Sequence, residues 1–163
     1  MNRTFRPDLT FLFSHPAHTI ACGLGSGLSY IAPGTVGTLF AWFLYLLFGD
    51  FFSEDYLAIF LGVALVVGFF VCHRTGKDLG VVDHGSIVWD EMVAFWLILI
   101  VIPNHWIWQT AGFFLFRFFD VFKPPVASWF DERVKNGFGV MMDDVIAACY
   151  ALFFLALWKR VFL

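Results

Sequence analysis

Apolar residues fall into five blocks along the chain, separated by short polar segments. The blocks cover residues 35–49, 56–72, 86–102, 106–122 and 140–158. Each is at or just below the about 17–25 residues that cross a membrane as a helix, and polar residues that line a cavity can complete a short span. An earlier stretch, LTFLFSHPAHTI, is amphipathic and is predicted to lie on the surface or to re-enter. The pattern therefore predicts an all-α, polytopic membrane helix bundle with about five crossings.

The amino-acid composition also indicates a membrane protein. Hydrophobic residues make up 60% of the 163 residues and charged residues 14%, whereas soluble domains are usually about 45–50% apolar and about 25% charged. The 23 Phe and 7 Trp are too many for one small aqueous core. Residues 1–163 are therefore predicted to form a single integral membrane domain. The chain has no basic stripe of the kind that binds nucleic acid. Its three cysteines are isolated from one another, which predicts free thiols.

The positions of Lys and Arg predict the orientation in the membrane. Arg3 and Arg6 precede the first block, Arg74 and Lys77 follow the second, and the intervening loop 50–55 carries only acids. With the N-terminus in the cytoplasm, eight of the ten basic residues lie on the cytoplasmic side, as the positive-inside rule requires. We therefore expect the N-terminus to be cytoplasmic.

That orientation places carboxylates from three separate segments at one depth on the cytoplasmic side: Asp90, Glu91, Asp120, Asp143 and Asp144. An ionised side chain near hydrocarbon costs at least about 2.5–3.5 kcal/mol, so it normally has a partner or a function. Oxygen ligands gathered at one place suit Mg²⁺, which keeps some waters and bridges to phosphate. Two alternatives stay open. The carboxylates could form a proton relay in a small transporter or channel subunit, or they could merely cap helix ends.

Two basic residues flank one of these carboxylates in FRFFDVFKPP. Arg117, Asp120 and Lys123 are spaced three apart, which would place them on one broad helix face, and Pro124 predicts the end of that helix. Cations beside a bound metal suit a phosphate ligand, while a positive-inside flank with an internal ion pair is the plain alternative. The following FDERV, residues 130–134, is predicted to be a solvated loop.

A glycine-rich stretch, GLGSGLSYIAPGTVGTL, occupies residues 23–39. Its backbone N–H groups and the hydroxyls of Ser26, Thr35 and Thr38 could bind an anion. It lacks the lysine of a P-loop, and such glycine spacing is also typical of packed membrane helices, so packing or a re-entrant turn stays open. His84 precedes the WDE carboxylates and could act as a general acid or base, or lie in a surface loop.

Four motifs follow one another along the chain: GSGLSYIAPGTVGTL, DHGSIVWDE, FRFFDVFKPP and GFGVMMDDVIA. In their sequence, order and spacing the chain resembles the phosphatidylglycerophosphatase A family between about residues 15 and 150. The resemblance implies Mg²⁺-dependent hydrolysis of phosphatidylglycerophosphate at the cytoplasmic face of a bacterial inner membrane. It carries catalytic and metal-binding roles onto the five carboxylates, and phosphate binding onto Arg117 and Lys123. The chain departs from the family pattern at Ala94, where a glycine is usual, and in NGFG, where a double glycine is expected.

Overall fold

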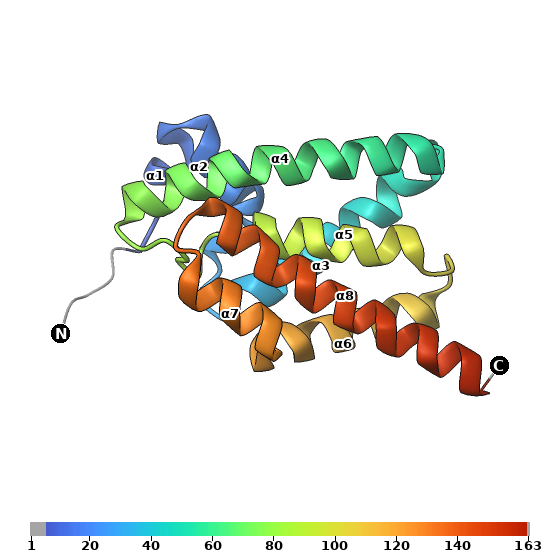
Figure 1. Ribbon diagram of the computed structural model, residues 1–163. Helices are drawn as coiled ribbons and strands as arrows, with labels where there is room; N and C mark the ends of the chain where they lie inside the picture. Colours follow the sequence, from blue (N-terminus) through green and yellow to red (C-terminus); the bar gives the residue numbers. More distant parts are fainter. Residues whose placement is uncertain (1–5, 163) are drawn as a thin grey trace.

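The computed structural model describes residues 6–162, so Arg3 of the orientation argument lies outside the described residues. Within that range all regular secondary structure is helical, which confirms the predicted all-α class. Five longer helices run back and forth along the molecule (Figure 1): α3 (Pro33–Phe48), α4 (Glu54–Leu79), α5 (Trp89–Val101), α6 (Trp106–Phe122) and α8 (Gly137–Phe162). Because their directions alternate, the beginnings of α3, α5 and α8 meet the ends of α4 and α6 at one end of the bundle.

Three helical segments are long and apolar enough to cross a membrane: Pro33–Phe51, Glu54–Leu79 and Gly137–Val161. The other two predicted crossings form shorter helices. At 1.5 Å per residue, the 13 residues of α5 span about 20 Å and the 17 residues of α6 about 25 Å, against a hydrocarbon core of about 30 Å. The helix lengths thus support three of the five predicted spans.

Helix α5 forms the centre of the bundle, packed against α3, α4, α6 and α8. Most of its residues are buried, which explains why it is apolar on every side. Phe95 is fully buried and packs edge-on against Trp42 of α3 and Phe113 of α6, with ring centroids 5.9 Å apart in both pairs. The indole nitrogen of Trp96 donates to the backbone carbonyl of Ala41 at 2.9 Å, so this buried side chain of α5 is also hydrogen-bonded to α3.

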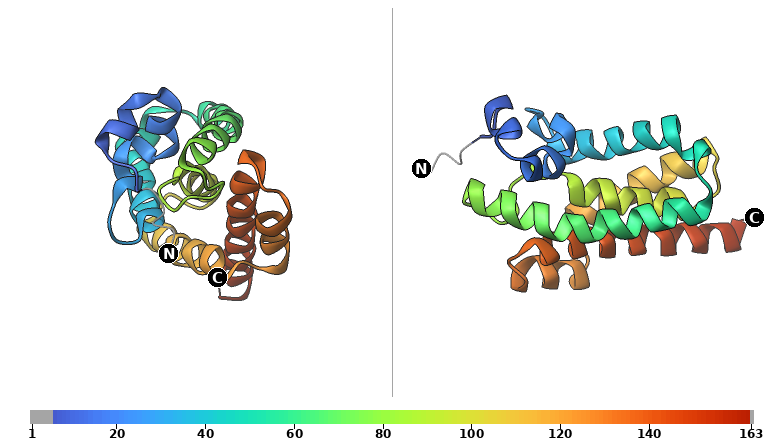
Figure 2. Two further views of the ribbon diagram at one scale, coloured as in Figure 1. Left: turned by 90° about the vertical axis from the view of Figure 1, so that its left-hand side faces the viewer. Right: turned by 90° about the horizontal axis from the view of Figure 1, so that it is seen from above.

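The predicted amphipathic segment near the N-terminus forms two short helices, α1 (Leu9–Ser14) and α2 (Pro16–Ala21), followed by the 3₁₀ helix η1 (Gly23–Leu28). The Asp8 carboxylate caps α1 and the His15 ring caps α2, whose first residue is a proline. These elements lie beside the C-terminal end of α4 in both views of Figure 2. A second 3₁₀ helix, η2 (Gly49–Phe51), links α3 to α4.

The region after Pro124 differs from the sequence prediction. Residues predicted as a loop form the end of a helix, α7 (Pro125–Arg133), which packs on α8. A proline is tolerated in the first turn, where its missing N–H would have no helical partner, so Pro125 begins a new helix after α6 ends at Phe122. The expected solvation is confirmed, because Glu132 and Arg133 are exposed.

The outer surface of the bundle is apolar over much of its length. Large side chains remain exposed on α3, α4, α6 and α8, among them Phe43, Val63, Phe70, Phe114 and Phe153. Exposed large apolar side chains in such numbers are unusual for a soluble monomer and are typical of helices that face lipid. All three cysteines are unpaired, as predicted.

Candidate functional site

Helices α5 and α8 begin at the same end of the bundle (Figure 1), and three carboxylates from these two helices converge there. Asp90 and Glu91 lie in the first turn of α5, and Asp144 lies two turns into α8. Each contributes one oxygen to a group in which all three oxygens lie within 4.8 Å of one another. Asp90 and Asp144 are 4% exposed, so three acidic groups share a nearly dry site.

The close approach of α5 and α8 depends on small side chains. Ala94 on α5 and Ala147, Ala148 and Ala151 on α8 are all buried. Small residues let two helix backbones come together, which is the usual device for packing helices in membranes. Ala94 lies one turn after Asp90, and Ala147 and Ala148 lie one turn after Asp144, on two helices that pack together.

Arg117 of α6 reaches the carboxylates from a third helix. Its Nη1 atom lies 2.7 Å from Asp120 Oδ2 and 3.4 Å from Glu91 Oε1, and it also donates to Thr38 Oγ1 at 3.5 Å. Arg117 Nε and Glu91 Oε2 are buried without a hydrogen-bond partner among the described residues. Because buried polar groups are normally paired, these two atoms mark places where a ligand can complete the hydrogen bonding.

The first turn of α3 forms another wall of the site. A Cβ atom at Gly34 would overlap the Glu91 carboxylate and lie 3.2 Å from Arg117 Nη2, so only glycine leaves room there. The buried Thr38 hydroxyl donates to the Gly34 carbonyl at 2.9 Å. The glycine-rich motif pointed to this region, but nothing in the motif distinguished Gly34 from its neighbours as the residue against the carboxylate.

Lys123 and Asp143 form a second ion pair next to the site, with Nζ and Oδ2 2.8 Å apart. Lys123 lies beyond the end of α6, so of the three residues predicted to share a helix face only Arg117 and Asp120 do so. Its backbone is left-handed, with φ 37°, directly before Pro124, and this costly conformation holds its ammonium toward α8. The other oxygen of Asp143 accepts from the N–H of Asp144 at 3.1 Å, which ties the pair to the carboxylate group.

The remaining predicted residues belong to the glycine-rich stretch and to the loop that precedes α5. The Ser26 hydroxyl donates to the Gly23 carbonyl within its own loop at 2.8 Å. His84 is half-buried, and its Nδ1 accepts from the N–H of Ser86 at 3.1 Å, in the loop that leads into α5. Thr35 lies in the first turn of α3 beside Gly34. The two halves of the glycine-rich stretch therefore have different surroundings. The 3₁₀ helix η1 packs against α2 and α3, whereas Gly34 and Thr38 lie beside Glu91 and Arg117.

The chemistry of the donor set favours a divalent cation with oxygen ligands. Among the described residues, the five carboxylates predicted from the sequence gather at this end of the bundle together with Arg117 and Lys123. A divalent ion among Asp90, Glu91 and Asp144 would offset the excess negative charge, and carboxylate oxygens are the ligands that Mg²⁺ and Mn²⁺ prefer. The arrangement can thus hold a metal ion with a cationic residue beside it.

The chain matches a family model described as phosphatidylglycerophosphatase A over residues 19–159. It is 46% identical to a phosphatidylglycerophosphatase A of Escherichia coli over 138 residues, which cover 82% of this chain and 78% of the relative. A phosphatidylglycerophosphatase A of Haemophilus influenzae is 45% identical over 139 residues, 85% of each chain. A putative phosphatidylinositol-3-phosphatase of Bacteroides thetaiotaomicron is 35% identical over 151 residues, 87% of this chain and 92% of the relative. No solved structure matches significantly.

Proposed function

The chain belongs to the phosphatidylglycerophosphatase A family, and we propose that it hydrolyses phosphatidylglycerophosphate to phosphatidylglycerol and phosphate with Mg²⁺ as its cofactor. The observation that carries the proposal is the group of three converging carboxylates beside an arginine with an unused donor. Both named phosphatidylglycerophosphatase relatives are 45% identical or more over at least 78% of their lengths, so the substrate class follows from them.

Asp90, Glu91 and Asp144 are the residues that would hold the ion. Their oxygens lie close enough to share it, and Glu91 Oε2 is buried without a partner. When bound, the ion would neutralise charge on the phosphoryl oxygens and lower the pKa of the attacking water. This charge neutralisation matters because hydrolysis of phosphate monoesters is among the slowest uncatalysed reactions.

Arg117 and Lys123 would bind the terminal phosphate of the lipid. Arg117 can direct its buried Nε–H at a phosphate oxygen, while Asp120 holds the guanidinium in place through the 2.7 Å ion pair. Asp143 does the same for the Lys123 ammonium. We therefore assign Asp120 and Asp143 to the positioning of the two cations rather than to the ion. A carboxylate of the group would also accept the proton of the attacking water.

The site suits a substrate that stays in the bilayer. All its residues come from one end of the bundle, the depth at which a lipid headgroup lies, while the apolar outer surface faces the acyl chains (Figure 1). Most of the basic residues fall at the same end, and this favours the cytoplasmic face. We propose that the protein acts at this face of the bacterial inner membrane.

The test is phosphate release by the purified protein in detergent micelles, across a Mg²⁺ titration with and without chelator. Phosphatidylinositol 3-phosphate serves as a second substrate, because one relative is named for it. We expect metal-dependent release, fastest from phosphatidylglycerophosphate. Folded protein that releases no phosphate with metal present would overturn the proposal and favour the proton-relay alternative.

Glu91→Gln and Glu132→Gln supply a matched pair for the same assay. Both substitutions remove one carboxylate charge, but Glu91 lies in the carboxylate group and Glu132 is exposed on α7. We expect Glu91→Gln to lower turnover by at least about 100-fold, the upper range for disturbing a metal site, and Glu132→Gln to retain it. Near-normal turnover of Glu91→Gln would show that Glu91 does not bind the metal ion.

A further inference from the structure

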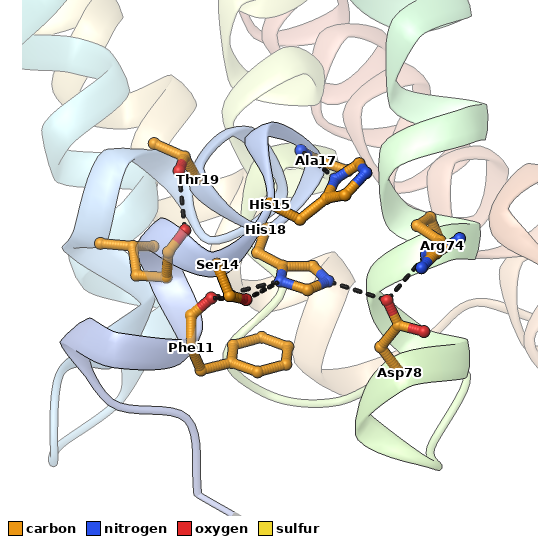
Figure 3. Close-up of polar contacts among 9 residues, drawn as sticks. Phe11, Ser14, His15, Ala17, His18, Thr19, Arg74 and Asp78 are labelled. Atoms are coloured by element: carbon orange, nitrogen blue, oxygen red, sulfur yellow. Dashed lines mark hydrogen bonds and ion pairs between the residues drawn. The ribbon is translucent and has the colours of Figure 1, made fainter.

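A second polar cluster, built around the buried ring of His18, lies between α2 and α4, apart from the carboxylates (Figure 3). The His18 ring of α2 is 4% exposed, and its Nε2 lies 3.0 Å from Asp78 Oδ2 near the end of α4. The same Asp78 oxygen accepts from Arg74 Nε at 2.7 Å. The ring also stacks on Phe11 of α1, with centroids 4.1 Å apart. The proposed function uses none of these residues.

The hydrogen bonds around His18 join three elements. The Ser14 hydroxyl donates to the Phe11 carbonyl at 2.7 Å. Nδ1 lies 3.0 Å from that hydroxyl oxygen and 3.2 Å from the same carbonyl, and Nε2 faces a carboxylate. Both ring nitrogens are therefore engaged, Nδ1 with α1 and Nε2 with α4. The contacts of Ser14, His18 and Asp78 anchor α2 between α1 and α4.

Helix α2 in turn holds the beginning of α5. The Ala21 carbonyl at its end accepts from the N–H of Val88 at 2.9 Å, and Val88 directly precedes the first turn of α5. The Val88 side chain fills the space above two glycines, since a Cβ at Gly23 or Gly37 would come within 2.7 Å of it. The segment that follows α2 thus fixes where Asp90 and Glu91 begin their helix.

Helix α4, which carries Asp78, contacts the beginning of α8. Cys72 Sγ lies 3.8 Å from Met141 Sδ, three residues before Asp144. The backbone of α4 at Phe69 contacts Gly137 so closely that a side chain there would overlap it. The beginning of α5 therefore contacts α2 and the beginning of α8 contacts α4, in addition to the direct packing of α5 on α8.

We propose that His18 and Asp78 are positioning residues, which join α2 to α4 and thereby set the spacing between the Asp90–Glu91 pair and Asp144. The proposal rests on the proposed function, because it assumes that these carboxylates share a metal ion. Arg74 offers a matched control. It contacts the same Asp78 oxygen, but it lies on α4 itself, one turn away, and so joins no second helix.

The experiment measures Mn²⁺ binding to purified full-length protein by electron paramagnetic resonance, without substrate, for His18→Leu, Asp78→Asn and Arg74→Gln. We expect the first two to raise the dissociation constant about tenfold, the lower end of the effect of losing an outer partner of a metal site. Arg74→Gln should bind like the wild type. Unchanged binding by His18→Leu and Asp78→Asn, or an equal loss in Arg74→Gln, would overturn the proposal.

Cys22 gives a second readout that needs no metal. It follows α2 and is fully buried, and burial raises the pKa of its thiol to about 11, so it should react slowly at pH 8 while α2 is held. Peptide-resolved mass spectrometry after maleimide treatment should show faster modification of Cys22 in Asp78→Asn than in Arg74→Gln. Equal rates would show that the pair does not hold α2. If His18→Leu does not fold, this comparison and the Mn²⁺ affinity of Asp78→Asn decide the matter.

The two proposals can fail separately. Wild-type protein that binds no Mn²⁺ and releases no phosphate would contradict the proposed function, whatever the modification rates of Cys22. Wild-type protein that binds Mn²⁺ and releases phosphate, together with unchanged Mn²⁺ affinity in Asp78→Asn and His18→Leu, would contradict only the positioning role.

Discussion

Glu91 is the residue on which most contacts of the site converge. Its carboxylate meets the first turn of α3 at Gly34, the guanidinium of Arg117 on α6, and the neighbouring acids of α5 and α8. Motif reasoning found the acids, because charged side chains in apolar segments are conspicuous. It could not find the contact with Gly34, which lies 57 positions earlier and carries no side chain to signal it.

Gly34→Ala should damage the site without unfolding the protein. The added methyl group would overlap the Glu91 carboxylate, which must then move. A displacement of about 1 Å near reacting groups can cost about 100-fold, so we expect phosphate release to fall by about 10–100-fold. Gly62→Ala on α4 is the control, because a Cβ there meets nothing within 4 Å. It should keep full activity and gain up to about 1 kcal/mol of stability. Equal activity of both variants would contradict the steric argument.

Thr75→Val should stabilise the protein. Thr75 is fully buried on α4, and its hydroxyl has no hydrogen-bond partner among the described residues. Replacing it by an apolar group of the same shape removes an unsatisfied polar atom, so we expect a gain of about 1 kcal/mol in the free energy of unfolding. Thr38→Val is the comparison, because that buried hydroxyl donates to the Gly34 carbonyl. Thermal unfolding in detergent measures the stability of both variants. A loss of stability in Thr75→Val would show that the Thr75 hydroxyl has a hydrogen-bond partner.

At the scale of elements, hydropathy predicted the long helices well and the short ones poorly. The blocks 35–49, 106–122 and 140–158 correspond to α3, α6 and α8 within a few residues. Helix α7 was missed because its nine residues are weakly hydrophobic, and the FDERV end of it resembles a polar loop. The short helices α1 and α2 owe their shape to two caps and a proline. Their link to α4 through His18 and Asp78 joins positions 60 residues apart, which one sequence does not reveal.

The ends of α6 and α8 are joined by Lys123 and Asp143, whose side chains are 29% and 6% exposed. Lys123→Met leaves a buried carboxylate without its cation, so we expect a loss of about 3 kcal/mol of stability, at the low end for breaking such a pair. Removing both charges in Lys123→Met/Asp143→Asn should recover most of this loss but not the activity, since Lys123 would bind phosphate. Thermal unfolding and phosphate release measure the two effects. Recovery of activity in the double variant would make the pair purely structural.

At the scale of the whole molecule, alternating helix directions bring the acidic motifs together. The four motifs are spread over more than a hundred residues, yet each adjoins a helix end on the same side of the bundle (Figure 1). The order of blocks and loops in the sequence was enough to predict this grouping. Which acids would converge depended on packing: Asp144 turns toward α5, while its neighbour Asp143 turns to Lys123.

The orientation of the bundle can be tested with two cysteines at opposite ends of α4. Ser53 precedes this helix at the end far from the site, and Lys77 lies in its last turn at the site end; both are exposed. In a Cys149→Ala background the other native thiols are buried. A membrane-impermeant maleimide applied to intact spheroplasts should modify Ser53→Cys and leave Lys77→Cys unmodified until the membrane is opened. The asymmetry follows from the basic residues at the site end, which the positive-inside rule keeps in the cytoplasm. Modification of Lys77→Cys in closed spheroplasts, with Ser53→Cys protected, would place the carboxylates on the outer face and contradict the proposed orientation.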